Sequence, residues 1–153
     1  MPHLISKAEA VARLVAEPPA PCVPCGLVGA AGDAMRVAES DGAVAVLSRY
    51  PVRWGQCLVI LRAHAVELTQ VDGEVFADAA RLAHRVGVAL EKTLKPARCY
   101  VAALGTAEEG VPMTFRHLHL NVIPVPESDA RPRQVLTWEH GIYDGSPAEW
   151  DEI

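Results

Sequence analysis

The strongest constraint on the fold is one long amphipathic segment, residues 73–94. Its apolar side chains recur at helical spacing, which predicts a helix with one buried face. Asp72 or Thr69 can cap its start, and Lys95-Pro96 ends it, because proline cannot continue a helix. The predicted buried face consists of Val75, Ala79, Leu82, Val86 and either Ala89 or Leu90. Such a face must be covered, so we expect a sheet that packs against it.

Short apolar segments on both sides of this helix predict the strands of that sheet. They are residues 37–39, 43–47, 56–61, 98–104 and 115–123. The segments before the helix follow one another without an intervening helix, and Asp41-Gly42 is a hairpin turn signal. This order favours an antiparallel sheet over alternating βαβ units, so we expect an α+β fold with about five strands and one long helix.

The two ends of the chain lie outside this pattern. Residues 4–16 have apolar positions at helical spacing, with Ser6 as a possible cap, and residues 17–21 are proline-rich and end the helix. The last segment is rich in proline and acidic side chains. The expected organisation is an N-terminal helical extension (1–19), a central domain (20–126) and an acidic C-terminal arm along the surface (127–153).

The charge distribution bears on the class of partner. The chain has 14 Lys and Arg against 19 Asp and Glu, a formal net charge of −5. A protein that binds the nucleic-acid backbone would show a basic face, so we expect no such binding. Residues 1–126 carry twelve acidic and twelve basic side chains, and the excess of acid lies beyond them. A small anionic ligand in the central domain is therefore compatible with the charge.

The sequence shows no signal peptide and no apolar run long enough to span a membrane, so we expect a cytoplasmic protein that binds no membrane. In a reducing compartment, a Cys-x-x-Cys pair such as Cys22 and Cys25 is a candidate for metal binding or redox chemistry. Cys57 and Cys99 lie in apolar strand segments and are expected in the core.

Residues 116–124 carry the most informative polar side chains. Successive side chains of a strand point to opposite faces, so His117, His119 and Asn121 are expected on one face and the intervening leucines on the other. A single histidine in a half-exposed strand would be unremarkable. Two imidazoles and an amide on one face indicate a functional surface.

This segment resembles the histidine triad signature of a superfamily of nucleotide hydrolases and transferases. Three upstream segments occur in the order and spacing of that family: residues 22–25, 46–60 and 62–64. The resemblance covers residues 20–126, which would form a HIT-like catalytic domain. It implies a nucleotide hydrolase or nucleotidyltransferase that acts on nucleoside phosphoanhydrides or related conjugates, and a homodimer that joins two sheets.

The resemblance also implies residue roles. His119, the middle position, would attack the α-phosphate and form a covalent nucleotidyl-histidine. His117 and Asn121 would orient that ring and contact the phosphate. The expected substrate-binding residues are Thr114, Ser48 and Arg116, with Arg49 and Arg53 as further candidates for phosphate contact.

Three positions depart from the family pattern. Asn121 stands where the third histidine is usual, and its amide can bind phosphate but cannot titrate. Ser48 stands where an Asp or Asn usually binds the ribose hydroxyls, and Met113 replaces a common polar residue. These departures leave a second interpretation open, a HIT-like nucleotide-binding protein with weak or lost catalysis.

Cys22, Cys25, His64 and His117 form a possible zinc set, since zinc favours tetrahedral sites of two sulfur and two nitrogen ligands. The resemblance implies the same four ligands for a structural Zn²⁺. Two alternatives stay open: a redox pair, and two thiols of no special role. The redox motif usually starts a helix at its first cysteine, and the glycine-containing segment from Gly26 is a poor helix start.

Overall fold

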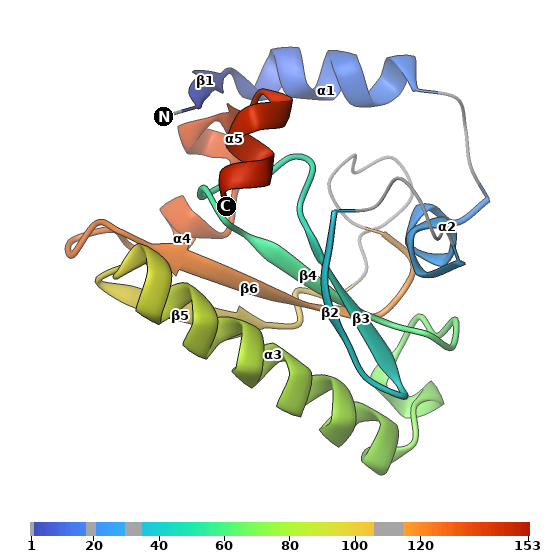
Figure 1. Cartoon of the computed structure of the whole chain (residues 1–153). Coiled ribbons are helices and arrows are strands. Elements are labelled where there is room, and N and C mark those ends of the chain that lie inside the picture. The colour runs from blue at the N-terminus through green and yellow to red at the C-terminus, as the bar shows by residue number, and fades with distance from the viewer. Residues whose placement is uncertain (1, 18–20, 30–34, 106–114) are drawn as a thin grey trace.

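The computed structural model describes residues 2–17, 21–29, 35–105 and 115–153. Its centre is a five-stranded sheet in the order β2-β3-β4-β6-β5, antiparallel throughout (Figure 1). The strands are β2 (Arg36–Glu39), β3 (Ala43–Leu47), β4 (Cys57–Leu61), β5 (Arg98–Ala102) and β6 (His119–Val125). The predicted α+β architecture, with five antiparallel strands and one long helix, is confirmed.

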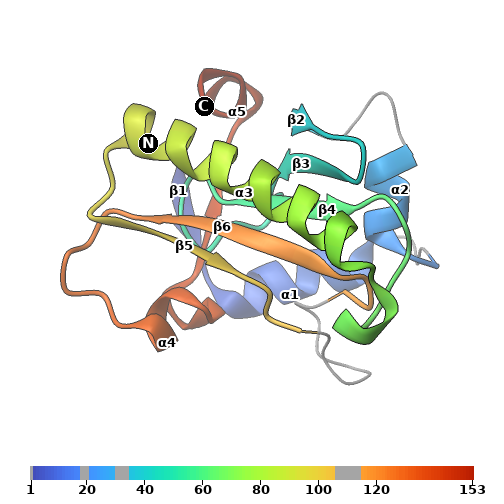
Figure 2. The ribbon, with the colours of Figure 1, turned by 90° about the horizontal axis from the view of Figure 1, so that it is seen from below.

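The long helix α3 (Gly73–Leu94) has the predicted bounds and lies along one face of the sheet (Figure 2). The Asp72 side chain caps it by accepting a hydrogen bond from the Glu74 N–H, and Lys95 ends it in the left-handed conformation. Its buried residues are Ala79, Leu82, Ala83, Val86, Gly87 and Leu90. They pack against alternate residues of β3, β4 and β6, so this face of the sheet is buried in the hydrophobic core. None of the described helices is both long and apolar enough to cross a membrane.

Leu82→Ala is expected to lower the free energy of unfolding by about 2–5 kcal/mol, because it leaves a cavity between α3 and the sheet. Leu82 is 1% exposed, whereas Leu68 is 59% exposed. The same substitution at Leu68 should change stability by about 0.5 kcal/mol or less. Urea denaturation of the two variants tests this contrast, and equal losses would contradict it.

The two ends of the chain meet and pack as part of the fold (Figure 1). Strand β1 (His3–Ile5) pairs antiparallel with β7 (Ile142–Asp144). The other elements are α1 (Lys7–Ala16), α2 (Val23–Gly29), α4 (Pro132–Val135), α5 (Pro147–Glu152) and two short 3₁₀ helices, Leu68–Gln70 and Trp138–His140. A second apolar cluster joins β1, α1, α4, the 3₁₀ helix Trp138–His140 and β7 to the end of β6: Ile5, Ala10, Val52, Ile123, Val125, Val135, Trp138 and Ile142. The expected helix over 4–16 therefore begins only at Lys7, after the Ser6 cap, and residues 127–153 contribute buried side chains.

Strand β6 differs from its expected range, 115–123. It begins at His119 and includes Pro124. The pairing with β4 ends at Val122, so Pro124 is paired only with β5. Proline is tolerated at such a one-sided position of a sheet. His117 lies in the bend before the strand. The prediction that His117 shares a strand face with His119 and Asn121 is therefore wrong for His117.

Candidate functional site

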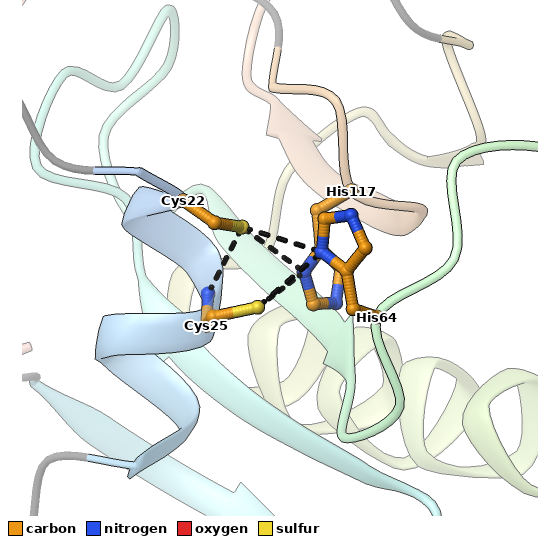
Figure 3. A group of neighbouring side chains, drawn as sticks. All are labelled: Cys22, Cys25, His64 and His117. Atoms are coloured by element: carbon orange, nitrogen blue, oxygen red, sulfur yellow. Dashed lines mark hydrogen bonds between the residues drawn. The ribbon is translucent and has the colours of Figure 1, made fainter.

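The side chains of Cys22, Cys25, His64 and His117 converge on one point (Figure 3). Their ligand atoms lie within 4.8 Å of one another. Each histidine Nδ1 lies 3.3–3.5 Å from each cysteine Sγ. With ordinary zinc bond lengths, a tetrahedral site has S···N edges of about 3.5 Å. The group could therefore hold a metal ion of that size and geometry.

The two cysteines are placed by helix α2 (Val23–Gly29). Cys22 precedes its first residue, and the Cys22 Sγ accepts a hydrogen bond from the Cys25 N–H at 3.4 Å. The Gly26 N–H donates to the Cys22 carbonyl, which continues the first helical turn. The expectation that this segment would not form a helix is wrong, because the sulfur and the carbonyl of Cys22 satisfy donors at the helix start.

The two histidines lie in segments that a backbone hydrogen bond joins. His64 follows β4, His117 precedes β6, and the Leu118 N–H donates to the Ala65 carbonyl. His117 Nε2 lies 2.8 Å from the Leu61 carbonyl, which can only accept, so Nε2 carries the proton. His117 Nδ1 thus has a free lone pair directed at the thiols. Burial lowers the pKa of His117, which favours this neutral form.

His119 is half-buried at the start of β6. Its Nδ1 lies 2.8 Å from the His117 carbonyl, so Nδ1 donates and Nε2 keeps its lone pair. Burial lowers the pKa of His119, although the hydrogen bond to the His117 carbonyl acts in the opposite direction. The ring is consequently neutral near pH 7 and can act as a nucleophile through Nε2.

Asn121 lies beyond His119 on the face of the sheet that α3 does not cover. The register pairs His119 with Ile60 and Asn121 with Leu58. Ser48 directly follows β3, and its N–H donates to the Gln56 carbonyl at 2.8 Å, which extends the same ladder. Ser48 and Asn121 are 7% and 5% exposed. His119 and Asn121 therefore lie on one face of the sheet, where Val44, Val46, Leu58 and Ile60 form an apolar cluster, and β4 lies between Asn121 and Ser48.

Gln56 contacts Asn121 on this face, although no motif in the sequence indicated it as a site residue. Its Nε2 donates to Asn121 Oδ1 at 2.9 Å, between two buried side chains. The sequence signal was a polar residue in phase with Leu58 and Ile60, at the start of an otherwise apolar strand. Such a polar residue on an apolar face needs a partner, which here is Asn121.

The three arginines expected to contact phosphate have different surroundings in the structure. Arg53 is 2% exposed and donates to Glu127 at 3.0 Å, so it supports the fold and does not serve as a phosphate contact. Arg49 pairs with Glu17 at 3.1 Å. Arg116 is exposed in the bend before β6. Thr114 and Met113, named in the sequence analysis, lie outside the described residues.

Comparison with known proteins agrees with this geometry. The chain matches the HIT domain over residues 31–127. It is 31% identical over 108 residues to an uncharacterized HIT-like protein from Mycoplasma genitalium, covering 70% of this chain and 74% of the relative. It is 31% identical over 109 residues to one from Mycobacterium tuberculosis, covering 71% and 74%.

The structure is similar to the crystal structure of a Zn-bound histidine triad family protein from Mycobacterium smegmatis. The TM-score is 0.67 at 26% sequence identity, over 86% of this chain and 88% of that chain. The domain match spans the central sheet, helix α3 and the histidine segment, and Cys22 and Cys25 precede it. The chain therefore belongs to the HIT family of histidine triad proteins.

Proposed function

We propose that this protein is a nucleotide hydrolase or nucleotidyltransferase that works through a covalent nucleotidyl-histidine at His119. The observation that carries the proposal is the hydrogen bond from His119 Nδ1 to the His117 carbonyl, which leaves Nε2 unprotonated on the face of the sheet that α3 does not cover. Nε2 forms a bond to the α-phosphorus while the bond to the leaving group breaks. Water, phosphate or another acceptor then attacks the phosphorus, and the histidine leaves as a neutral imidazole.

Three further residues support binding in this proposal. Asn121 occupies the third motif position and donates to phosphate oxygens through its amide, a preorganised contact of the kind that stabilises developing charge. Ser48, separated from Asn121 by β4, binds a ribose hydroxyl. Arg116, in the exposed bend before β6, and Thr114 contact the phosphate chain. His117 acts through its carbonyl, which orients the His119 ring.

We further propose that Cys22, Cys25, His64 and His117 hold a structural Zn²⁺. The four donor atoms suit a tetrahedral zinc in number, type and separation. Four protein ligands would fill a tetrahedral Zn²⁺ site, so the ion would supply rigidity and no chemistry. His117, held as one of these ligands, would fix the bend whose carbonyl orients His119.

The proposed activity is tested by incubating the purified protein with dinucleoside polyphosphates, nucleotide sugars and adenosine phosphoramidate. We expect release of a nucleoside monophosphate from at least one class. The second candidate, nucleotide binding with weak or lost catalysis, is favoured by the non-titrating amide of Asn121. It predicts that nucleoside monophosphates raise the melting temperature while no substrate turns over. If the nucleotides neither stabilise the protein nor turn over, both candidates fail.

Asn121→His is expected to raise kcat/KM for adenosine phosphoramidate by about a hundredfold, the lower end of general acid effects. An imidazole can supply the proton that an amine leaving group needs, and an amide cannot. A phosphoanhydride leaves as a stable anion, so its hydrolysis should change far less. Asn121→Gln keeps an amide and is the matched control. An equal gain for both substrate classes would contradict the argument.

We also propose that the protein is cytoplasmic and forms a homodimer through its sheet. Strand β5 is an edge of the sheet, and Val101 on it is 51% exposed. An exposed apolar edge strand is a natural place for pairing with a second copy. Light scattering is expected to give twice the monomer mass of 16.4 kDa. A monomer at micromolar concentration would refute the dimer.

A further inference from the structure

We propose that Gln56 is a positioning residue that decides which end of the Asn121 amide faces the substrate phosphate. The proposal rests on the proposed function of the site. Gln56 lies at the start of the β3–β4–β6 ladder and contacts Asn121 from the side of β4. Its effect on the substrate is indirect, because it acts through the orientation of Asn121.

The direction of the hydrogen bonds begins at the backbone of Val52. The Val52 N–H lies 2.8 Å from Gln56 Oε1, and a backbone N–H can only donate. The oxygen of the Gln56 amide must therefore face Val52. Its nitrogen end then faces Asn121 and donates to Oδ1 at 2.9 Å. The Asn121 amide is consequently held with its oxygen toward Gln56.

The nitrogen of the same Asn121 amide points away from Gln56. Within the described part of the chain, Asn121 Nδ2 has no hydrogen-bond partner. Every fully buried side-chain nitrogen or oxygen atom in that part has one. Nδ2 is therefore not fully buried, and it lies on the face that carries His119. It can offer its N–H groups to phosphate oxygens. The reverse orientation would present Oδ1 to those oxygens and repel them.

Further contacts fix the position of Val52, where this series of hydrogen bonds begins. The Arg53 guanidinium donates to the Val52 carbonyl at 2.8 Å and to Glu127 at 3.0 Å, and Arg53 is 2% exposed. The apolar side chain of Val52 is buried in the cluster formed with the chain ends. The low exposure of both amides keeps water from competing for their hydrogen bonds. One amide orientation is therefore strongly favoured before substrate binds.

The first test uses the unmodified protein labelled with ¹⁵N. When AMP is added, the side-chain NH₂ signals of Asn121 are expected to shift strongly and those of Gln56 to shift little. Strong shifts of the Gln56 signals with unchanged Asn121 signals would overturn the proposal. If AMP shifts no signal in the protein, the proposed nucleotide function fails, and this inference fails with it.

The second test is a double-mutant cycle read by AMP affinity. Gln56→Met is expected to weaken AMP binding about tenfold, the effect of losing one oriented hydrogen bond to a charged group. In the Asn121→Ala background, the same change should have almost no effect on affinity. Gln134→Met is the control, since this exposed glutamine accepts from the Arg131 N–H in a similar way. An equal loss of affinity in both backgrounds would reduce Gln56 to a structural role and overturn the proposal.

Discussion

His119→Ala is expected to lower kcat by about 10⁴–10⁶, as removal of a covalent nucleophile does in other enzymes. Without an imidazole at this position, no nucleotidyl intermediate can form. Binding of AMP should change only a few-fold, because the Asn121 amide and the rest of the sheet face remain. Steady-state turnover and equilibrium binding, measured on the same preparation, separate the two effects.

The intermediate itself can be detected. Wild-type protein mixed with an α-³²P-labelled substrate and quenched in alkali should carry label, because a phosphorus–nitrogen bond to histidine survives alkali. His119→Ala should carry none. His84→Ala is the matched control, since His84 is exposed on α3. Unchanged turnover in His119→Ala would refute the nucleophile, and equal losses of turnover and AMP affinity would assign His119 a binding role.

Removal of the metal by a chelator is expected to lower the melting temperature by about 10 °C or more, equivalent to at least about 3–5 kcal/mol for a chain of this size. The proposed metal would join α2 to the segments after β4 and before β6, and so add to the Leu118–Ala65 hydrogen bond and the apolar contacts of Leu27, Val28 and Phe115 that already link them. Elemental analysis of the purified protein should give one equivalent of zinc. Turnover should fall together with the metal content, because the His117 carbonyl would no longer hold the His119 ring.

Cysteine variants separate the metal site from its alternatives. Cys22→Ser should lose the zinc and show the same fall in melting temperature. Cys99→Ser, which alters a thiol outside the cluster, should keep both. A metal-free protein with dithiol activity that Cys22→Ser abolishes would contradict the zinc site and favour the redox pair. A metal-free protein without such activity would leave Cys22 and Cys25 as ordinary thiols.

The site shows where local patterns suffice and where they do not. Alternation placed His119 and Asn121 on one face correctly, because both lie within β6. The same rule was wrong for His117, because the strand begins only where β4 offers a partner, at Ile60 opposite His119. The segment before that point bends, and it carries the His117 ring to the cysteines instead.

Two polar residues show the same limit. Arg53 was a candidate phosphate contact because it is basic. The structure buries it against Glu127, which lies 74 positions further along the chain. Gln56 showed only a weak signal in the sequence, and its role appears once Asn121 is seen across the ladder. In both cases the partner is distant in sequence, so no local pattern could indicate it.

The sequence by itself determined the α+β class, helix α3 with its caps, strand β3 and the Cys22-x-x-Cys25 pair. These features depend on periodicity, caps and residue types within short segments, which act locally. The tertiary structure alone decided the pairing of β1 with β7, the start of β6 and the orientation of the Asn121 amide. Each of these depends on hydrogen bonds between segments far apart in the chain, which form only when the fold brings their donors and acceptors together.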